Sequence, residues 1–176
     1  MNRRLAQGIQ GARPEPAASV DAVVALGSNL GDRQTILAEA VADLGRMPLT
    51  GRVRVAPIIE SVAVRVDGPD ADAPAYLNTV AIVPTRLAPS ILLSYLQAIE
   101  QRHGRERRER WGDRTLDLDL IAYGDLRIRT ARLEVPHPRA AERAFVLMPW
   151  LQLDPDAVLP GIGRVDGLRA AREDRP

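Results

Sequence analysis

Hydrophobic and polar residues follow two patterns along the chain, one typical of strands and one typical of helices. Short apolar runs, some alternating with polar residues, predict strands at residues 21–29, 51–66, 75–85 and 114–130. Apolar residues three or four positions apart predict helices within 30–48 and 87–105, and a further short helix within 136–155. Pro57 interrupts the second strand, and Gly124-Asp125 predicts a hairpin.

The resulting order is β-α-β-β-α-β followed by a helix, which predicts an α+β fold of the ferredoxin-like, split-βαβ kind. In such a sandwich we expect an antiparallel sheet with the helices packed on one face. A length of 176 residues suits one domain, which we assign to 20–165. Residues 1–19 are rich in Arg, Gly, Pro and Ala and are expected to form a disordered extension, and 166–176 a C-terminal tail.

Composition narrows the class of protein. The net charge is only +1, which argues against nucleic acid or a membrane surface as a partner. The chain has no cysteine, so thiolate chemistry and cysteine-based metal sites are excluded, and a cytoplasmic location is expected. No apolar run approaches the roughly 20 residues of a membrane span. We expect a monomer that acts on small molecules.

Two aspartates in TLDLDLIAY are the first candidate site. Strand side chains alternate, so Asp117 and Asp119 share one face while Leu116, Leu118 and Leu120 point into the core. Same-face neighbours lie about 6.5–7 Å apart at Cα, and carboxylates held so close repel unless a cation lies between them. Mg²⁺, with phosphate oxygens completing its shell, is the usual solution. Alone, an Asp-x-Asp pair is more often a solvated surface feature.

The segment before this strand is unusually rich in arginine, with Arg102, Arg105, Arg107, Arg108, Arg110 and Arg114. A guanidinium fork suits polyphosphate oxygens, so arginines beside an Asp pair favour a phosphate site over a solvated loop. His103, within this run, is expected to be solvated. His137 lies between two prolines in VPHPR and could donate to a phosphate, although such a histidine is more often structural.

Two other features are less specific. GSNLGD at 27–32 joins a strand to a helix and could hold an anion, although a simple turn with Asn29 or Asp32 near the N-cap explains it equally well. A P-loop is excluded because the chain has no lysine. The few aromatic residues (3%) could pack in the core or stack on a flat heterocycle whose edge Asn78 would read.

Together these motifs resemble the 6-hydroxymethyl-7,8-dihydropterin pyrophosphokinase family of folate biosynthesis. The resemblance spans about residues 21–160 and rests on four segments in the family's order: ALGSNLGDR (25–33), YLN (76–78), the arginine-rich block ending in RTLDLDLIAYG (105–124), and VPHPRAAERAFVLMP (135–149). It implies transfer of pyrophosphate from ATP to the 6-hydroxymethyl oxygen with release of AMP, and it implies the same ferredoxin-like fold.

The resemblance also implies roles for individual residues. Asp117 and Asp119 would bind two Mg²⁺ ions that bridge the ATP phosphates, and would act with Arg105 and Arg114 as the catalytic residues. ATP would contact Gln97, Glu100, Arg107, Arg110, Leu120, His137 and Arg143. The pterin would contact Ser61, Val64, Tyr76, Asn78, Trp111 and Phe145, with Tyr76 and Phe145 on its two faces.

One region departs from the family's pattern. In residues 60–74, Ser61 stands where the family has threonine, and Val62-Ala63 stands where it has proline, in a loop that contributes pterin contacts. Three other readings stay open. An inactive paralogue would share every motif. A ferredoxin-like binding module would need exposed aromatics or a basic sheet face. A polymerase-beta-like nucleotidyltransferase would place its Asp pair about a dozen residues after Gly-Ser, whereas here the separation is about 90.

Overall fold

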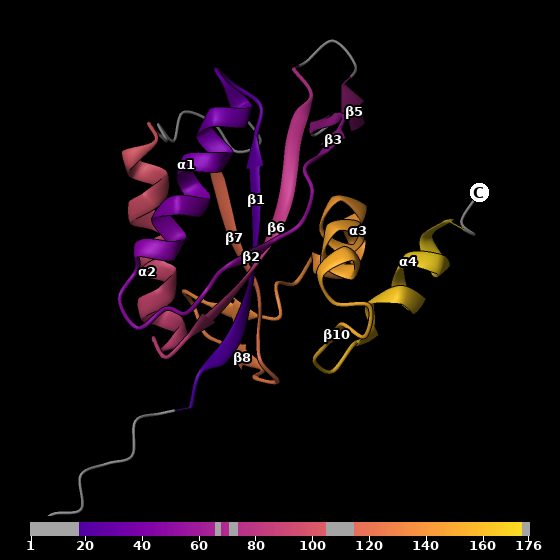
Figure 1. Cartoon of the computed structure of the whole chain (residues 1–176). Helices are drawn as coiled ribbons and strands as arrows, with labels where there is room; N and C mark the ends of the chain where they lie inside the picture. The colour runs from indigo at the N-terminus through magenta and orange to yellow at the C-terminus, as the bar shows by residue number, and fades with distance from the viewer. Residues whose placement is uncertain (1–17, 66–67, 71–73, 105–114, 174–176) are drawn as a thin grey trace, which may run out of the picture.

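A computed structural model describes residues 18–65, 68–70, 74–104 and 115–173, with the backbone alone for 63–65, 68–70 and 170–173 (Figure 1). Within this part of the chain, five strands form the main sheet in the order β2-β6-β1-β7, with β3 also beside β6. Their bounds are β1 (Val20–Ser28), β2 (Arg54–Val55), β3 (Ile59–Ser61), β6 (Tyr76–Thr85) and β7 (Asp117–Tyr123).

Every pairing in this sheet is antiparallel. Strand β6 lies between β1 and β2, which are joined through helix α1 (Arg33–Arg46), so the βαβ unit is split by an inserted strand. Helix α2 (Pro89–Arg102) connects β6 to β7 in the same way. The predicted split-βαβ, antiparallel fold is confirmed.

Helices α1 and α2 cover one face of the sheet (Figure 1). Their inward residues, which include Leu37, Leu44, Leu92 and Leu96, are buried against Leu26 and its neighbours. Asp32 accepts a hydrogen bond from the Thr35 backbone N–H and caps α1, and Pro89 begins α2, a position where its missing N–H costs nothing. The prediction of a simple cap at Asp32 is confirmed.

The expectation that the helices share one face is wrong. Helix α3 (Ala144–Leu153), preceded by the 3₁₀ turn η1 (Ala140–Glu142), packs on the opposite face, where Val146, Leu147 and Trp150 are buried against Val23 and Ile82. The reason is visible in β1. Residues 22–26 are apolar without alternation, so this strand is buried on both faces and needs a cover on each.

A β-bulge in β7 decides which side chains reach which face. The pairing with β1 shifts register between Val23 and Val24. Before the bulge, Leu118 and Leu120 lie in the α1–α2 core. Ile121 is the unpaired residue of the bulge, and both it and Ala122 lie in the core covered by α3. Asp117 and Asp119 alternate with the leucines and therefore lie on the α3 face. The prediction that the leucines point into the core is confirmed.

Short hairpins complete the described chain: β4 (Ala63–Arg65) with β5 (Gly68–Asp70), β8 (Ile128–Arg129) with β9 (Glu134–Val135), and β10 (Val158–Leu159) with β11 (Gly163–Arg164). The chain turns at Gly124 as expected, with the Leu126 N–H donating to the Tyr123 carbonyl at 3.1 Å. The strand beyond the turn pairs with β9 and not with β7, so the predicted hairpin at that turn is wrong.

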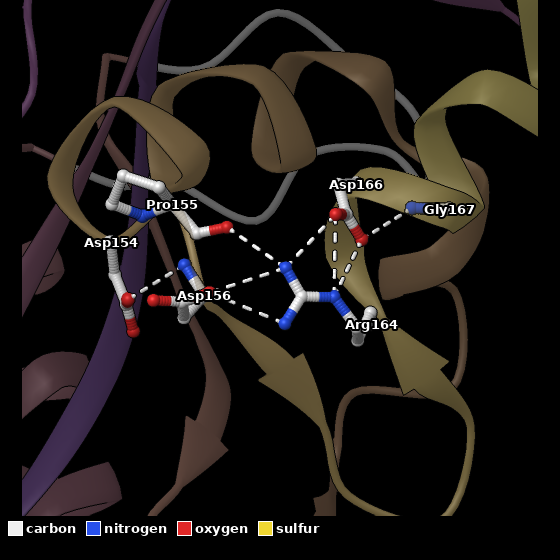
Figure 2. A network of polar contacts seen from close by, with 6 residues as sticks. All are labelled: Asp154, Pro155, Asp156, Arg164, Asp166 and Gly167. Atoms are coloured by element: carbon white, nitrogen blue, oxygen red, sulfur yellow. Dashed lines mark hydrogen bonds and ion pairs between the residues drawn. The ribbon is translucent and has the colours of Figure 1, made fainter.

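The C-terminal region is more ordered than the predicted tail. Helix α4 (Val165–Glu173) follows β11 and packs on α3 (Figure 1). At the start of this helix, the Arg164 guanidinium donates to Asp166 at 3.0 Å and to Asp156 at 3.3 Å (Figure 2). No helix in the described ranges combines the length and apolar character of a membrane span. Residues 1–17, most of the expected extension, lie outside those ranges.

Candidate active site

One end of the α3 face brings together polar residues from separate strands of the sheet. Gly27 in β1 is the direct partner of Asn78 in β6 and of Asp117 in β7. One pair further along, Ala25 faces Asp119. Polar groups from the two outer strands therefore lie on either side of small residues of the middle strand. The sheet register brings Gly27 together with residues about 50 and 90 positions away in the sequence.

Arg143 and His137 converge on Asp119. The Arg143 guanidinium donates a short hydrogen bond to Asp119 Oδ2, and His137 Nε2 lies 3.9 Å from the same oxygen. Arg143 also stands 5.7 Å from the centre of the Phe145 ring, close enough for a cation–π interaction. All four side chains are partly exposed. A phosphate entering here would meet a guanidinium and an imidazole that are already positioned.

The tautomer of His137 follows from its hydrogen bonds. The Arg139 backbone N–H donates to His137 Nδ1 at 3.1 Å, so the ring proton is on Nε2, which faces Asp119. Burial lowers the pKa of His137 below its usual value, Arg143 and Arg139 lower it further, and the nearby carboxylates only partly oppose this. The histidine is therefore neutral at pH 7 and offers an N–H donor toward the carboxylate side of the site.

Asn78 is fixed on the other side of Gly27. Its Nδ2 donates to Ser61 Oγ at 2.7 Å and to the Tyr76 carbonyl at 3.5 Å. These donations orient the amide so that Oδ1 lies toward Gly27, 3.2 Å from where a Cβ on that glycine would stand. The Tyr76 ring lies beside it, with Cδ1 3.7 Å from the same point. An acceptor oxygen next to a half-buried ring is suited to the edge of a flat heterocycle.

The turn after β1 supports this side of the site. Asn29 donates to the Pro74 carbonyl at 3.4 Å, and Arg33 donates to the carbonyl of Ala75. Both bonds attach the segment just before Tyr76 to the start of α1. Asn29 of GSNLGD and the neighbouring Arg33 therefore hold the entry to β6, and Asp32 caps the N-terminus of α1.

Three expected nucleotide contacts lie on the other side of the sheet. The Leu120 side chain is buried in the α1–α2 core. Glu100 is also buried, and its Oε1 accepts a hydrogen bond from the Leu118 backbone N–H at 2.8 Å, between the two aspartates of β7. Gln97 is exposed on α2. The structure does not bring these side chains together with Asp119, and their contact with a nucleotide stays a prediction.

Five further candidates, Arg105, Arg107, Arg110, Trp111 and Arg114, lie outside the described residues, and for Val64 only the backbone is described. His103, expected to be solvated, instead has a side chain that is only 9% exposed, with its Nε2 3.2 Å from Asp43 Oδ2. That expectation is wrong because the partner comes from α1, 60 residues earlier. Gly27 was not singled out as a site residue from the sequence, where it appeared only as part of GSNLGD. The alternate positions Val23, Ala25 and Gly27, which decrease in size toward the strand end, were the available signal.

The side chains at this site can be compared with those that a bound Mg²⁺ ion requires. Within the described residues, no group of three or more His, Asp or Glu side chains could enclose a metal ion. Asp117 and Asp119 offer two carboxylates on one partly exposed face. Mg²⁺ is commonly bound by one or two carboxylates together with substrate phosphates and water, not by an all-protein cage. The residues therefore fit a divalent cation that arrives with a polyphosphate, and they do not fit a permanent metal centre.

Comparisons with known proteins point to one family. The family model described as 7,8-dihydro-6-hydroxymethylpterin-pyrophosphokinase (HPPK) matches residues 23–155. A 2-amino-4-hydroxy-6-hydroxymethyldihydropteridine pyrophosphokinase of Pseudomonas aeruginosa is 45% identical over 148 residues, covering 84% of this chain and 89% of the relative. The protein of that name from Bacillus subtilis is 42% identical over 132 residues, covering 75% and 77%.

The solved structures confirm the fold. A crystal structure of wild-type Plasmodium falciparum HPPK-DHPS has a TM-score of 0.67 at 13% sequence identity, covering 88% of this chain. This chain spans only 42% of that protein, and at such low identity the likeness shows the fold alone. The matches in sequence carry the assignment: the chain belongs to the 7,8-dihydro-6-hydroxymethylpterin-pyrophosphokinase family.

Proposed function

We propose that the chain performs the reaction of its family at this end of the sheet. It transfers the pyrophosphoryl group of ATP to the hydroxymethyl oxygen of 6-hydroxymethyl-7,8-dihydropterin and releases AMP, a step of folate biosynthesis. The observation that supports this most is the register of three strands, in which Asn78, Gly27 and Asp117 are direct partners. A ring-binding group and a cation-binding group thereby face each other across one residue.

The phosphate side is proposed to consist of Asp117, Asp119, Arg143 and His137. Bound Mg²⁺, held by the two aspartates, would supply charge neutralisation for the polyphosphate. Arg143, which in the structure is paired with Asp119, can share its five N–H donors with a phosphate oxygen. Neutral His137 offers Nε2–H as a further donor without adding charge. These groups favour a transition state in which negative charge spreads over the transferred phosphate.

The pterin side is proposed to consist of Asn78, Tyr76, Phe145 and Ser61. Ser61 accepts a hydrogen bond from the Asn78 amide and so fixes its orientation. The amide Oδ1 then points toward Gly27, where N–H donors of a bound ring can reach it. A pterin edge carries such donors, whereas a ring without them would leave the amide oxygen unpaired. Serine in place of the family's threonine retains this acceptor. The pair of rings, Tyr76 from β6 and Phe145 from α3, then supplies apolar contact.

The experiment that tests the function is an assay of AMP formation from ATP and Mg²⁺, with and without 6-hydroxymethyl-7,8-dihydropterin. We expect AMP and the pyrophosphorylated pterin in equal amounts, and only slow AMP release without pterin. If purified, folded protein forms no AMP in a pterin-dependent way, the proposal fails and an inactive paralogue becomes the better description. The use of two Mg²⁺ ions is tested in the same assay by the order of the rate in free Mg²⁺.

A further inference from the structure

The inner strand of the site carries progressively smaller residues toward its end. On the α3 face of β1, Val23 is buried under the helix, Ala25 follows beside Asp119, and Gly27 follows between Asn78 and Asp117. Neighbouring strands lie about 4.8 Å apart, so the Cα atoms of Asn78 and Asp117 are separated by roughly 9.6 Å with only Gly27 between them. The surface of the sheet at this point is bare backbone.

The backbone does not require glycine here. Gly27 is paired on both sides within regular β-strand, and its φ lies outside the left-handed region that only glycine adopts easily. Glycine inside a strand weakens it, because the unfolded chain gains freedom and no side chain packs. Among the described residues, a Cβ at this position would meet only two atoms within 4 Å, Asn78 Oδ1 at 3.2 Å and Tyr76 Cδ1 at 3.7 Å. Both belong to the pterin side of the site.

We propose that Gly27 is a specificity-determining residue that admits the one-carbon hydroxymethyl arm of the substrate. With no side chain on Gly27, the arm of a ring held by Asn78 passes over the bare strand and reaches the phosphate side at Asp117. A methyl group at this point would occupy the path of the arm. The inference rests on the proposed function, and it names the determinant by which this site selects a 6-substituted pterin.

The test compares two identical substitutions. Gly27→Ala places a methyl group in the path, whereas Gly45→Ala adds one on the exposed side of α1, where a Cβ meets no atom within 4 Å among the described residues. We expect kcat/KM for the pterin to fall by about 10–200-fold in Gly27→Ala, the range for one misplaced methyl group in a pocket. The KM for ATP should change less than about threefold, and Gly45→Ala should match the wild type in both.

A second readout separates the arm from the ring. Isothermal titration with 6-hydroxymethyl-7,8-dihydropterin and with 7,8-dihydropterin, which lacks the arm, is carried out on the wild type and both variants. We expect Gly27→Ala to lose affinity for the substituted pterin and to keep it for the unsubstituted one. An equal loss for both pterins would show that the methyl group merely displaces Asn78, and it would overturn the inference, as would unchanged pterin kinetics or a fall in melting temperature with parallel loss for both substrates.

Failure of the inference and failure of the proposed function give different results. A wild type that binds the substituted pterin but forms no AMP refutes the function, and the titrations of Gly27→Ala still decide the role of Gly27. A wild type that binds neither pterin refutes both. A wild type with full activity and a Gly27→Ala variant with the same kinetics refutes the inference alone.

Discussion

Two clusters in this protein contain the same three kinds of residue, an aspartate, an arginine and a histidine, on opposite faces of the sheet. In the first, Asp43 of α1 binds Arg102 at 2.9 Å and His103 at 3.2 Å, at the end of α2. Arg46 adds a third contact at 3.3 Å. The Asp43 side chain is 9% exposed, and both of its oxygens are occupied. This cluster joins two helices and has no carboxylate oxygen to offer a ligand.

The second cluster is more open. Asp119 is 29% exposed, and the contacts from Arg143 and His137 converge on its Oδ2. It lies at the end of an edge strand, with Asp117 on the same face. The comparison shows that the residue types alone do not distinguish a structural cluster from a functional one. The two clusters differ in how far the aspartate is buried and in whether its oxygens already accept hydrogen bonds. Each cluster can be changed by mutation without changing the other.

The largest effect is expected when the open cluster loses a carboxylate. Asp117→Ala removes one of two proposed cation ligands from a partly exposed position, so turnover should fall at least about a hundredfold, the scale of losing one group that stabilises transition-state charge. The melting temperature should stay close to that of the wild type. Steady-state AMP formation and calorimetry measure the two quantities. A variant with normal turnover would remove the metal-ligand assignment.

The opposite pattern is expected at the closed cluster. Asp43→Asn removes a buried carboxylate from three hydrogen-bonding partners, two of which, Arg46 and Arg102, can return to water. We expect a loss of about 1–3 kcal/mol in the free energy of unfolding, because His103 stays buried with a weakened partner. Urea denaturation measures this loss. The kcat of the folded variant should stay within about threefold of the wild type, and a selective loss of turnover at unchanged stability would reverse the comparison.

The closed cluster also predicts a pH dependence. Burial acts to raise the pKa of Asp43, but the hydrogen bonds from His103 and Arg46 and the charge of Arg102 outweigh it, so the pKa is lowered in the folded protein. A lowered pKa stabilises the fold above the unfolded value, near 3.8, and this stabilisation disappears as the pH falls through the folded pKa. The stability gap between the wild type and Asp43→Asn should therefore shrink as the pH falls below about 4.

Urea titrations of both proteins at several pH values between 7 and 3 test this dependence. A gap that does not shrink between about pH 4 and 3 would mean that Asp43 is not held as a carboxylate by these partners.

The smallest effect is expected at the ion pairs of Figure 2. Arg164 bonds Asp156 and Asp166 on the surface, where salt and water weaken such pairs. Arg164→Gln should leave turnover unchanged and the melting temperature within experimental error of the wild type at 0.15 M salt. A clear loss of stability in a thermal scan would show that the start of α4 depends on this arginine more than its exposure suggests.

Much of the fold was predictable because it depends on local patterns. The order of strands and helices, the leucines of β7 and the cap at Asp32 all follow from residues close in sequence. The face covered by α3 was not predictable in the same way, because the helix is apolar around most of its circumference. Helix α4 was missed because its polar residues resemble those of a tail, and its packing partner α3 lies in another segment.

The site residues likewise fall into those that sequence motifs identify and those that depend on contacts between distant segments. Asp117, Asp119, Tyr76 and Asn78 were identified from motifs, and the structure places them on one face of the sheet, on β6 and β7 with β1 between them. The sequence could not show the contacts between distant residues. These are the pairing of His103 with Asp43, the hydrogen bond from the Leu118 N–H to buried Glu100, and the position of Gly27 between Asn78 and Asp117. Each depends on sheet register or helix packing, which join residues 18 to 60 positions apart, or more.

The assignment of the open cluster to catalysis is tested most directly by the rate of pterin-dependent AMP formation in Asp119→Asn, measured beside Asp43→Asn at a temperature where both are folded. Each change replaces one carboxylate oxygen by an amide nitrogen in a cluster of the same composition. We expect Asp119→Asn to lose at least about a hundredfold in rate and Asp43→Asn to stay within about threefold of the wild type. Equal rates in the two variants, or a larger loss in Asp43→Asn, would contradict the assignment of the open cluster to catalysis.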